Sequence, residues 1–167
     1  MGCGKSSVGR KLSQLLCCPF MDLDSYIEEI SGRSIPEIFA TDGESCFRKM
    51  ELEALREITR GRTSSDEHSQ SMILALGGGT VMTAECAEIV NKETTCIYLK
   101  ASADTLISHL EGETAHRPML HGESLGERIS VLMDQRSATY ENTAHIIIDT
   151  DGKSIDEIAA AIMNQIR

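Results

Sequence analysis

The sequence has no apolar segment long enough to cross a membrane. Its longest uninterrupted apolar run is six residues, from Ile158 to Met163, whereas a membrane-spanning helix needs about 18. The apolar stretch of a secretory signal is also missing from its beginning. We therefore expect a cytoplasmic protein that has no membrane partner.

Positive charge is scarce as well. The chain carries 16 lysines and arginines against 26 aspartates and glutamates, which gives a net charge of −10. This balance disfavours a broad surface for nucleic acid, because the like charges would repel phosphates. A small anionic substrate stays compatible with this composition if a few arginines gather in one cleft.

The six cysteines show no paired spacing. None of them forms a C-x-x-C pair, and no regular framework is present, so we interpret them as reduced thiols. A zinc site built from His116, His121 and scattered cysteines is the less favoured alternative, because the ligand spacing typical of such sites is missing.

The pattern of apolar residues predicts one α/β domain over residues 1–167. Short apolar runs at 19–21, 72–76, 95–99 and 145–149 predict strands, and amphipathic segments between them predict helices. The helices are expected at about 8–16, after the candidate caps Asp24 and Ser34, at 43–59, after Thr83, after Ser102, at 125–141 and after Ser154. This alternation is typical of a parallel sheet with helices on both faces. We expect a monomer.

A candidate phosphate-binding segment lies at the N-terminus. Gly4-Lys5-Ser6 is followed at once by an amphipathic helix, which is the second half of a phosphate loop: backbone N–H groups surround the phosphates, the lysine reaches them, and the serine ligates Mg²⁺. An ordinary glycine-rich N-terminus is the alternative. The full pattern needs an earlier glycine and a preceding strand, and neither is in the chain.

Two aspartates follow the first predicted strand. Asp22 and Asp24 are two residues apart, so in an extended segment they project to the same side. Such a pair suits one carboxylate that supports Mg²⁺ and one that accepts a hydroxyl proton. The alternative makes Asp24 a helix cap and Asp22 a solvated turn residue.

Charged residues also fall on apolar helix faces. Glu51 lies within an apolar stripe that includes Phe47, and Arg48 is three residues before it. A buried carboxylate needs a partner, and an arginine held in this way would bind a substrate carboxylate. An intrahelical ion pair is the alternative. Arg136 similarly lies on the inward stripe of a later helix, so an internal acid or a ligand should face it.

Two further segments are candidates for contact with a ligand. Gly77-Gly78-Gly79 follows a predicted strand and would permit close approach of a ligand to the backbone, although a plain turn is equally compatible. Residues 111–124 are polar and contain Arg117-Pro118. They suit a flap whose arginine closes over a phosphoryl group, or a surface turn.

Taken together, these motifs closely resemble shikimate kinase in order and spacing over essentially the whole chain. The segments that carry the resemblance are 2–10, Asp22-Leu23-Asp24, 32–35, 38–44, Phe47-Arg48, 77–79, Arg117-Pro118 and Arg136. The resemblance implies a three-layer P-loop fold of the nucleoside-monophosphate-kinase type. It also implies transfer of the γ-phosphoryl group of ATP to the 3-hydroxyl of shikimate, with Mg²⁺, in the biosynthesis of chorismate and aromatic amino acids.

The resemblance also implies a role for each matched residue. Those expected at ATP are Gly2, Cys3, Gly4, Lys5, Ser6, Ser7, Arg117 and Lys153. Those expected at shikimate are Asp24, Phe39, Phe47, Arg48, Glu51, Gly78 and Arg136. Ser6 and Asp22 are expected to support the metal, and the residues of the chemical step are Asp24 as base with Lys5 and Arg117. Residues 111–124 are expected to form the lid.

Two other functions remain open on the sequence alone. One is another small-molecule kinase of this fold, such as a gluconate kinase, which the two arginines and the aspartate pair disfavour. The other is a non-catalytic nucleotide-binding module with an incomplete phosphate loop.

We also expect that an apolar strand ending in glycine is encoded upstream of Met1, because the strand before the loop is central in P-loop folds.

Overall fold

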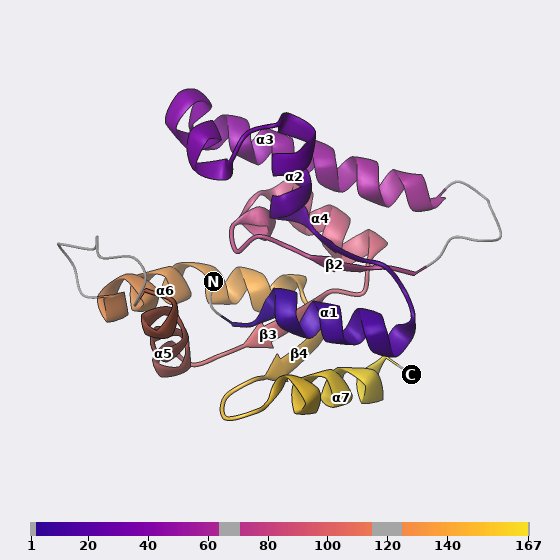
Figure 1. Ribbon diagram of the computed structural model, residues 1–167, viewed down its shortest axis with the longest axis vertical. Coiled ribbons are helices and arrows are strands. Elements are labelled where there is room, and N and C mark those ends of the chain that lie inside the picture. Colours follow the sequence, from indigo (N-terminus) through magenta and orange to yellow (C-terminus); the bar gives the residue numbers. More distant parts are fainter. Residues whose placement is uncertain (1–2, 64–70, 115–124, 167) are drawn as a thin grey trace.

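The computed structural model describes residues 3–63, 71–114 and 125–166. Helices and strands alternate along most of them, as expected (Figure 1). The elements are α1 (Lys5–Leu16), β1 (Phe20–Asp22), α2 (Leu23–Ser31), α3 (Ile35–Thr63), β2 (Ile73–Ala75), the 3₁₀ turn η1 (Thr80–Met82), α4 (Ala84–Glu93), β3 (Ile97–Lys100), α5 (Ala103–Thr114), α6 (Leu125–Thr143), β4 (Ile146–Asp149) and α7 (Ile155–Gln165). Within the described residues, none of these helices has the length and apolarity that a bilayer crossing requires.

The four strands form two parallel pairs. β1 pairs with β2, with Met21 opposite Leu74, and β3 pairs with β4, with Leu99 opposite Ile148. In the described part of the chain no ladder joins β2 to β3, so the strands make two two-stranded sheets. The predicted parallel α/β class is confirmed.

Helices cover the strands on both faces. On one face Val8 of α1 and Ile162 of α7 pack with Leu99 and Ile148 in one buried cluster. On the other face the buried side chains come from α3, η1 and α4: Leu55, Val81, Cys86 and Val90. Two partly buried side chains pack against them, Leu74 of β2 and Leu76, which follows that strand. Figure 1 shows α3 and α7 at opposite sides of the molecule with the strands between them.

The cap of α2 differs from the sequence-based expectation. Asp22, not Asp24, is the N-cap: its backbone is extended (φ −110°, ψ 123°), and its carboxylate accepts hydrogen bonds from the N–H groups of Asp24 and Ser25. The reason is that α2 begins immediately after β1, which places the last strand residue at the cap position. Asp24 lies in the first turn of α2, and its carboxylate is therefore not used as the cap.

Two expected boundaries also shift, and one is kept. The helix predicted at 43–59 is the second part of α3, which begins at Ile35 and is interrupted at Gly43, where φ is 79° and ψ is 171°. This left-handed φ suits glycine. The polar stretch 61–70 predicts a surface loop, but its residues 61–63 continue α3, and residues 111–114, expected in the lid, continue α5. The remaining residues of those two segments, 64–70 and 115–124, lie outside the described residues.

The packing of α1 depends on a glycine. A Cβ atom built at Gly9 would lie 2.6 Å from Cε2 of Phe20 and 3.4 Å from a methyl carbon of Ile73. The absence of a side chain therefore lets α1 approach β1 and β2 closely. In contrast, a Cβ at Gly61 in α3 would meet nothing within 4 Å.

Replacing these two glycines by alanine should have opposite effects. Alanine favours a helix by about 1 kcal/mol over glycine, so Gly61→Ala should raise the melting temperature. Gly9→Ala should lower it by the equivalent of about 1–3 kcal/mol, because overpacking outweighs the gain in helix propensity. The measurement is thermal unfolding followed by circular dichroism. A Gly9→Ala protein as stable as Gly61→Ala would contradict the close approach.

Candidate active site

The site begins at the N-terminus of α1. Gly4 adopts a left-handed conformation (φ 74°, ψ 18°) and precedes the helix, and its carbonyl oxygen accepts from the N–H of Val8 at 2.9 Å. The first turn carries no acidic side chain. Lys5 Nζ lies 3.7 Å from Cys3 Sγ, which places the ammonium group beside this turn. Free N–H groups, the helix dipole and a lysine together favour an anion here.

A hydroxyl and a carboxylate connect this helix to β1. Ser6 Oγ donates to Asp22 Oδ2 at 2.8 Å, while the other carboxylate oxygen, Oδ1, accepts from the Asp24 N–H at 3.1 Å. One oxygen of Asp22 is therefore structural and the other faces the serine. A hydroxyl and a carboxylate oxygen at this position are the hard ligands that Mg²⁺ prefers, so these residues fit that ion.

Asp24 lies beside the first glycine of the turn after β2. A Cβ atom at Gly77 would be 2.8 Å from Asp24 Oδ1. Burial raises the pKa of Asp24 above its ordinary value, and the nearby charges of Asp22 and Glu51 raise it further, while Lys5 opposes them. A carboxylate with a raised pKa is a better proton acceptor than an exposed one.

Arg48 is held by two carboxylates of its own helix. Its guanidinium donates to Glu44 Oε1 at 2.8 Å and also to Glu51 Oε2. Burial disfavours its charge, but the hydrogen bonds to Glu51 and Glu44 outweigh burial and raise the Arg48 pKa. The guanidinium lies directly against Gly79, because a Cβ there would be 2.4 Å from Nη2. The predicted pairing of Arg48 with Glu51 is confirmed.

Glu51 is also held from outside its helix. Its side chain is 1% exposed, and its second oxygen, Oε1, accepts from the Thr80 hydroxyl at 2.6 Å. Thr80 is itself fully buried. The sequence analysis did not identify Thr80, because this contact joins residues 29 positions apart and leaves no local pattern. Glu44 was also missed, although its spacing of four from Arg48 is a recognisable signal.

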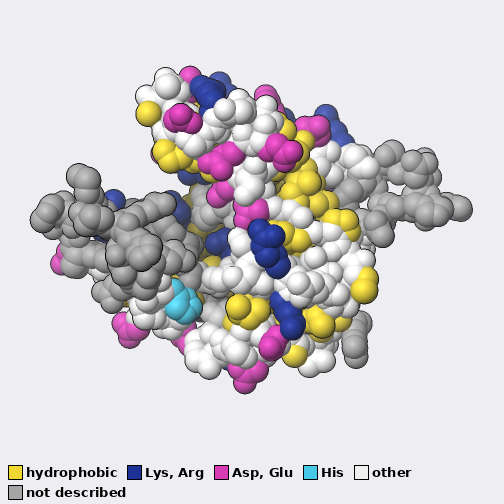
Figure 2. Space-filling view, in the orientation of Figure 1, with side chains coloured by type: hydrophobic (Ala, Val, Ile, Leu, Met, Phe, Trp, Pro, Cys, Tyr) yellow, Lys and Arg dark blue, Asp and Glu magenta, His cyan; other side chains and the backbone are white. Residues whose placement is uncertain are grey.

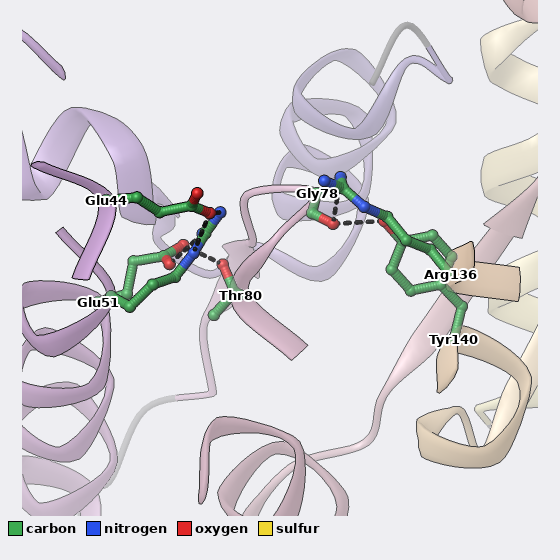
Figure 3. Close-up of polar contacts among 7 residues, drawn as sticks. Glu44, Glu51, Gly78, Thr80, Arg136 and Tyr140 are labelled. Carbon is green, nitrogen blue, oxygen red and sulfur yellow. Dashed lines mark hydrogen bonds and ion pairs between the residues drawn. The ribbon is translucent and has the colours of Figure 1, made fainter. Parts of the chain in front are cut away.

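Arg136 approaches the same turn from α6. Its Nη1 donates to the carbonyl oxygen of Gly78 at 3.2 Å, and the hydroxyl of Tyr140 donates to that same oxygen. Figure 3 shows the two sets of contacts on either side of the turn, with Glu44, Glu51 and Thr80 on one side and Arg136 and Tyr140 on the other. The role of Tyr140 was not predicted, although it lies four residues after Arg136 on one helix face.

The three consecutive glycines are therefore where the site residues meet. Gly77 contacts Asp24, Gly78 contacts Arg136, and Gly79 contacts Arg48. Side chains at Gly77 and Gly79 would displace these groups. The turn brings a carboxylate and two guanidinium groups from three helices to within reach of one small molecule, an arrangement that suits a ligand with both hydroxyl and carboxylate groups.

Two aromatic rings lie next to this charged set. The rings of Phe39 and Phe47 are 4.9 Å apart between centroids and tilted by 42°, and the guanidinium carbon of Arg48 lies 5.5 Å from the Phe47 centroid. Phe39 is 37% exposed. Such an exposed aromatic edge beside polar groups is typical of the wall of a ligand pocket.

Some expected residues are not placed at the site. Lys153 Nζ donates to the carbonyl oxygen of Asp149 at 2.6 Å, so its contacts are within the β4–α7 turn, and its role at ATP stays a prediction. Gly2 and Arg117 lie outside the described residues. Ser7, in the first turn of α1, also keeps a predicted role only.

A family comparison covers the whole chain. The family model described as shikimate kinase matches residues 1–167. A shikimate kinase of Thermus thermophilus is 37% identical over 166 residues, which cover 99% of this chain and 85% of the relative. That of Dictyoglomus turgidum is 37% identical over 169 residues, with 100% and 93% covered.

Solved structures give the same result. Shikimate kinase from Acinetobacter baumannii in complex with shikimate superposes with a TM-score of 0.85 at 31% identity, covering 99% of this chain and 88% of that one. Shikimate kinase from Bacteroides thetaiotaomicron has the same TM-score, 0.85, at 26% identity, with 99% and 93% covered.

The raised pKa of Asp24 predicts a stability gain when its charge is removed. A folded-state pKa above the unfolded value means that ionised Asp24 disfavours the folded state. This cost is fully present above the raised pKa and disappears below the unfolded value of about 3.9. Asp24→Asn should therefore melt at a higher temperature than the parent at pH 7, and the difference should shrink as pH falls toward 4.

The matched control is Asp156→Asn. Asp156 is an exposed carboxylate that pairs with Lys11 at 2.6 Å, and losing such a surface pair changes stability by about 0–1 kcal/mol. Its melting temperature should stay level or fall slightly at pH 7. An Asp24→Asn protein that is less stable than the parent at pH 7 would show that the carboxylate stabilises the fold.

Proposed function

The chain belongs to the shikimate kinase family, and from this membership and the geometry of the site we infer that it is an enzyme that phosphorylates shikimate with ATP. The observation that carries this inference is the meeting of Asp24, Arg48 and Arg136 at the Gly77–Gly79 turn. This turn presents a proton acceptor and two cations to one ligand. The specific transfer that we propose is from the γ-phosphate to the 3-hydroxyl.

We propose that the two arginines bind the substrate carboxylate with unequal strength. Arg48 is already paired with Glu44 and Glu51. Among the described residues, no carboxylate lies within ion-pair distance of Arg136, which donates a hydrogen bond to the neutral carbonyl oxygen of Gly78. The charge of Arg136 is therefore less neutralised, and it should bind the carboxylate more strongly. Arg48 would orient the ring, with Phe39 and Phe47 as a wall.

Asp24 is the proposed base. Its carboxylate is half-buried beside Gly77, and its pKa is raised by burial and by neighbouring carboxylates. Both effects strengthen it as an acceptor for the proton that the substrate hydroxyl loses when it attacks phosphorus. Glu51 would act on the substrate through Arg48, because its two oxygens are occupied by Arg48 and Thr80.

The N-terminus of α1 is the proposed phosphate site. Backbone N–H groups after Gly4 and the Lys5 ammonium would hold and orient the phosphates of ATP, with Cys3, Ser6 and Ser7 around them. Ser6 and Asp22 would hold Mg²⁺. When bound, this ion supplies positive charge that offsets the negative charge of the phosphates. Gly2, Arg117 and Lys153 keep their expected ATP contacts as part of the proposal.

We also propose that the enzyme works as a monomer in the cytoplasm. Arg48, Arg136 and Asp24 come from one chain and meet without a second copy. The six cysteines are free thiols, as is usual in a reducing compartment.

The direct test is ADP release measured with a panel of hydroxylated acids. Shikimate should be the substrate turned over with the highest kcat/KM. Preference for gluconate would assign the chain to another substrate class, and ATP binding with no turnover of any acid would indicate a non-catalytic nucleotide-binding module.

Loss of either arginine should weaken shikimate binding selectively. Arg136→Ala should cost about 2–5 kcal/mol of binding free energy, because the carboxylate loses a charged partner in a partly buried site. Arg48→Ala should cost less, since Arg48 is already paired. Isothermal titration with shikimate and with ATP measures both effects. Lys92→Ala, which removes an exposed cation paired with Glu88, is the control and should change neither affinity.

Substitution of the two aspartates should separate the base from the metal support. Asp24→Asn keeps the shape but removes the proton acceptor, so kcat should fall by at least about 100-fold. Asp22→Asn should instead raise the Mg²⁺ concentration needed for half-maximal rate. Steady-state ADP formation at varied Mg²⁺ measures both effects. Near-normal turnover of Asp24→Asn would remove Asp24 from the chemical step.

A further inference from the structure

The side-chain hydroxyl of Thr80 is a buried polar group that takes no part in the mechanism proposed above. Thr80 is fully buried, and its backbone completes the turn by itself. Its N–H donates to the carbonyl oxygen of Gly77 at 3.2 Å, and its carbonyl oxygen accepts from the N–H of Thr83 at 3.3 Å. The turn does not need the hydroxyl for these two hydrogen bonds. The contact of the hydroxyl with Glu51, at 2.6 Å, is therefore a separate feature of this residue.

This contact closes a ring of four residues. Glu51 accepts from Thr80 with Oε1 and from Arg48 with Oε2. The guanidinium of Arg48 lies against Gly79, which precedes Thr80 in the chain. Because the ring begins and ends at the glycine turn, its contacts fix the guanidinium relative to that turn. Without the hydroxyl, the carboxylate of Glu51 would be free to rotate, and Arg48 would lose a fixed partner.

The other carboxylate partner of Arg48 holds it less firmly. The side chain of Glu44 is 65% exposed, whereas that of Glu51 is 1% exposed, and exposed ion pairs contribute little because solvent screens their charges. Figure 2 also shows acidic side chains gathered on the surface over α2 and α3, and such carboxylates attract an arginine that is not held. The buried contact with Glu51 therefore decides where the guanidinium of Arg48 lies.

We propose that Thr80 is a positioning residue for substrate binding: its hydroxyl orients Glu51, and Glu51 in turn holds Arg48 in the place where shikimate binds. This inference rests on the proposed function and adds to it a residue that acts through other side chains. Supporting residues must hold the groups that contact a ligand to within about 0.5 Å, because a small displacement weakens binding. Thr80 therefore sets the affinity for shikimate and not the rate of phosphoryl transfer.

The first test removes the hydroxyl and keeps the shape of the side chain. Thr80→Val replaces the hydroxyl by a methyl group, so Oε1 of Glu51 loses its donor while the turn keeps its backbone hydrogen bonds. The KM for shikimate should rise about tenfold, whereas kcat and the KM for ATP should stay within about twofold of the parent, because only substrate positioning is lost. Steady-state ADP formation measures these constants. An unchanged KM for shikimate, with or without a loss of kcat, would overturn the proposal.

Two further variants separate the hydroxyl from the rest of the side chain. Thr80→Ser keeps the donor and loses the methyl group, so its KM for shikimate should equal that of the parent. A raised KM in Thr80→Ser would overturn the proposal even if Thr80→Val does not fold, because the methyl group would then be the part that matters. Thr59→Val is the matched control, since Thr59 is also buried but its hydroxyl donates to backbone carbonyl oxygens of its own helix, α3. This control should leave all three constants unchanged.

Titration of shikimate into a double variant tests whether Thr80 acts through Arg48. In the Arg48→Ala background the hydroxyl has no guanidinium to position, so adding Thr80→Val should change the Kd for shikimate by less than about twofold. In the parent background the same substitution should raise this Kd about tenfold. Equal effects in the two backgrounds would overturn the proposal, because the hydroxyl would then act independently of Arg48.

A measurement without substrate separates this proposal from the proposed function. In nitrogen-15 NMR spectra of the unliganded parent and of Thr80→Ser, the two terminal nitrogens of the Arg48 guanidinium should give separate signals, because fixed partners slow its rotation. Thr80→Val should give one averaged signal. Separate signals in Thr80→Val would overturn the positioning role even if shikimate is the substrate. An averaged signal in Thr80→Val, together with a parent that does not turn over shikimate, would overturn the proposed function and support the positioning of Arg48 by Thr80.

Discussion

A buried carboxylate organises the centre of this molecule. Glu51 is 1% exposed, and both of its oxygens are used, one by Arg48 and one by Thr80. Breaking a buried pair by removing one partner typically costs about 3–5 kcal/mol, so the three groups depend on one another. The result is that α3 is tied to the residue after the triple glycine, and the guanidinium of Arg48 is held against Gly79.

The glycine turn also contacts residues of two other helices, α2 and α6. With Arg48 held on one side, the Gly78 carbonyl anchors Arg136 and Tyr140 on the other, and Asp24 lies at Gly77. Asp24 follows β1 and the glycine turn follows β2, so the proposed substrate residues lie at the carboxyl ends of these parallel strands, where ligands commonly bind.

Much of this arrangement was predictable because its signals are local. The ion pair of Arg48 and Glu51 follows from a charge on an apolar stripe, and the capping box of Ser154 and Glu157 follows from their spacing. The boundaries of the helices were less predictable. The cap of α2 moved from Asp24 to Asp22, because a strand that leads directly into a helix leaves no separate cap residue.

Spacing along the chain was enough to predict the alternation of strands and helices, the helix that follows Gly4, and which charged residues lie on inward faces, because each depends on one element. The folded molecule was needed to show that Thr80 completes the hydrogen bonding of Glu51, and that Tyr140 and Arg136 share one carbonyl. These features join residues far apart in the chain, and contacts between distant residues are set by packing, which no local pattern encodes.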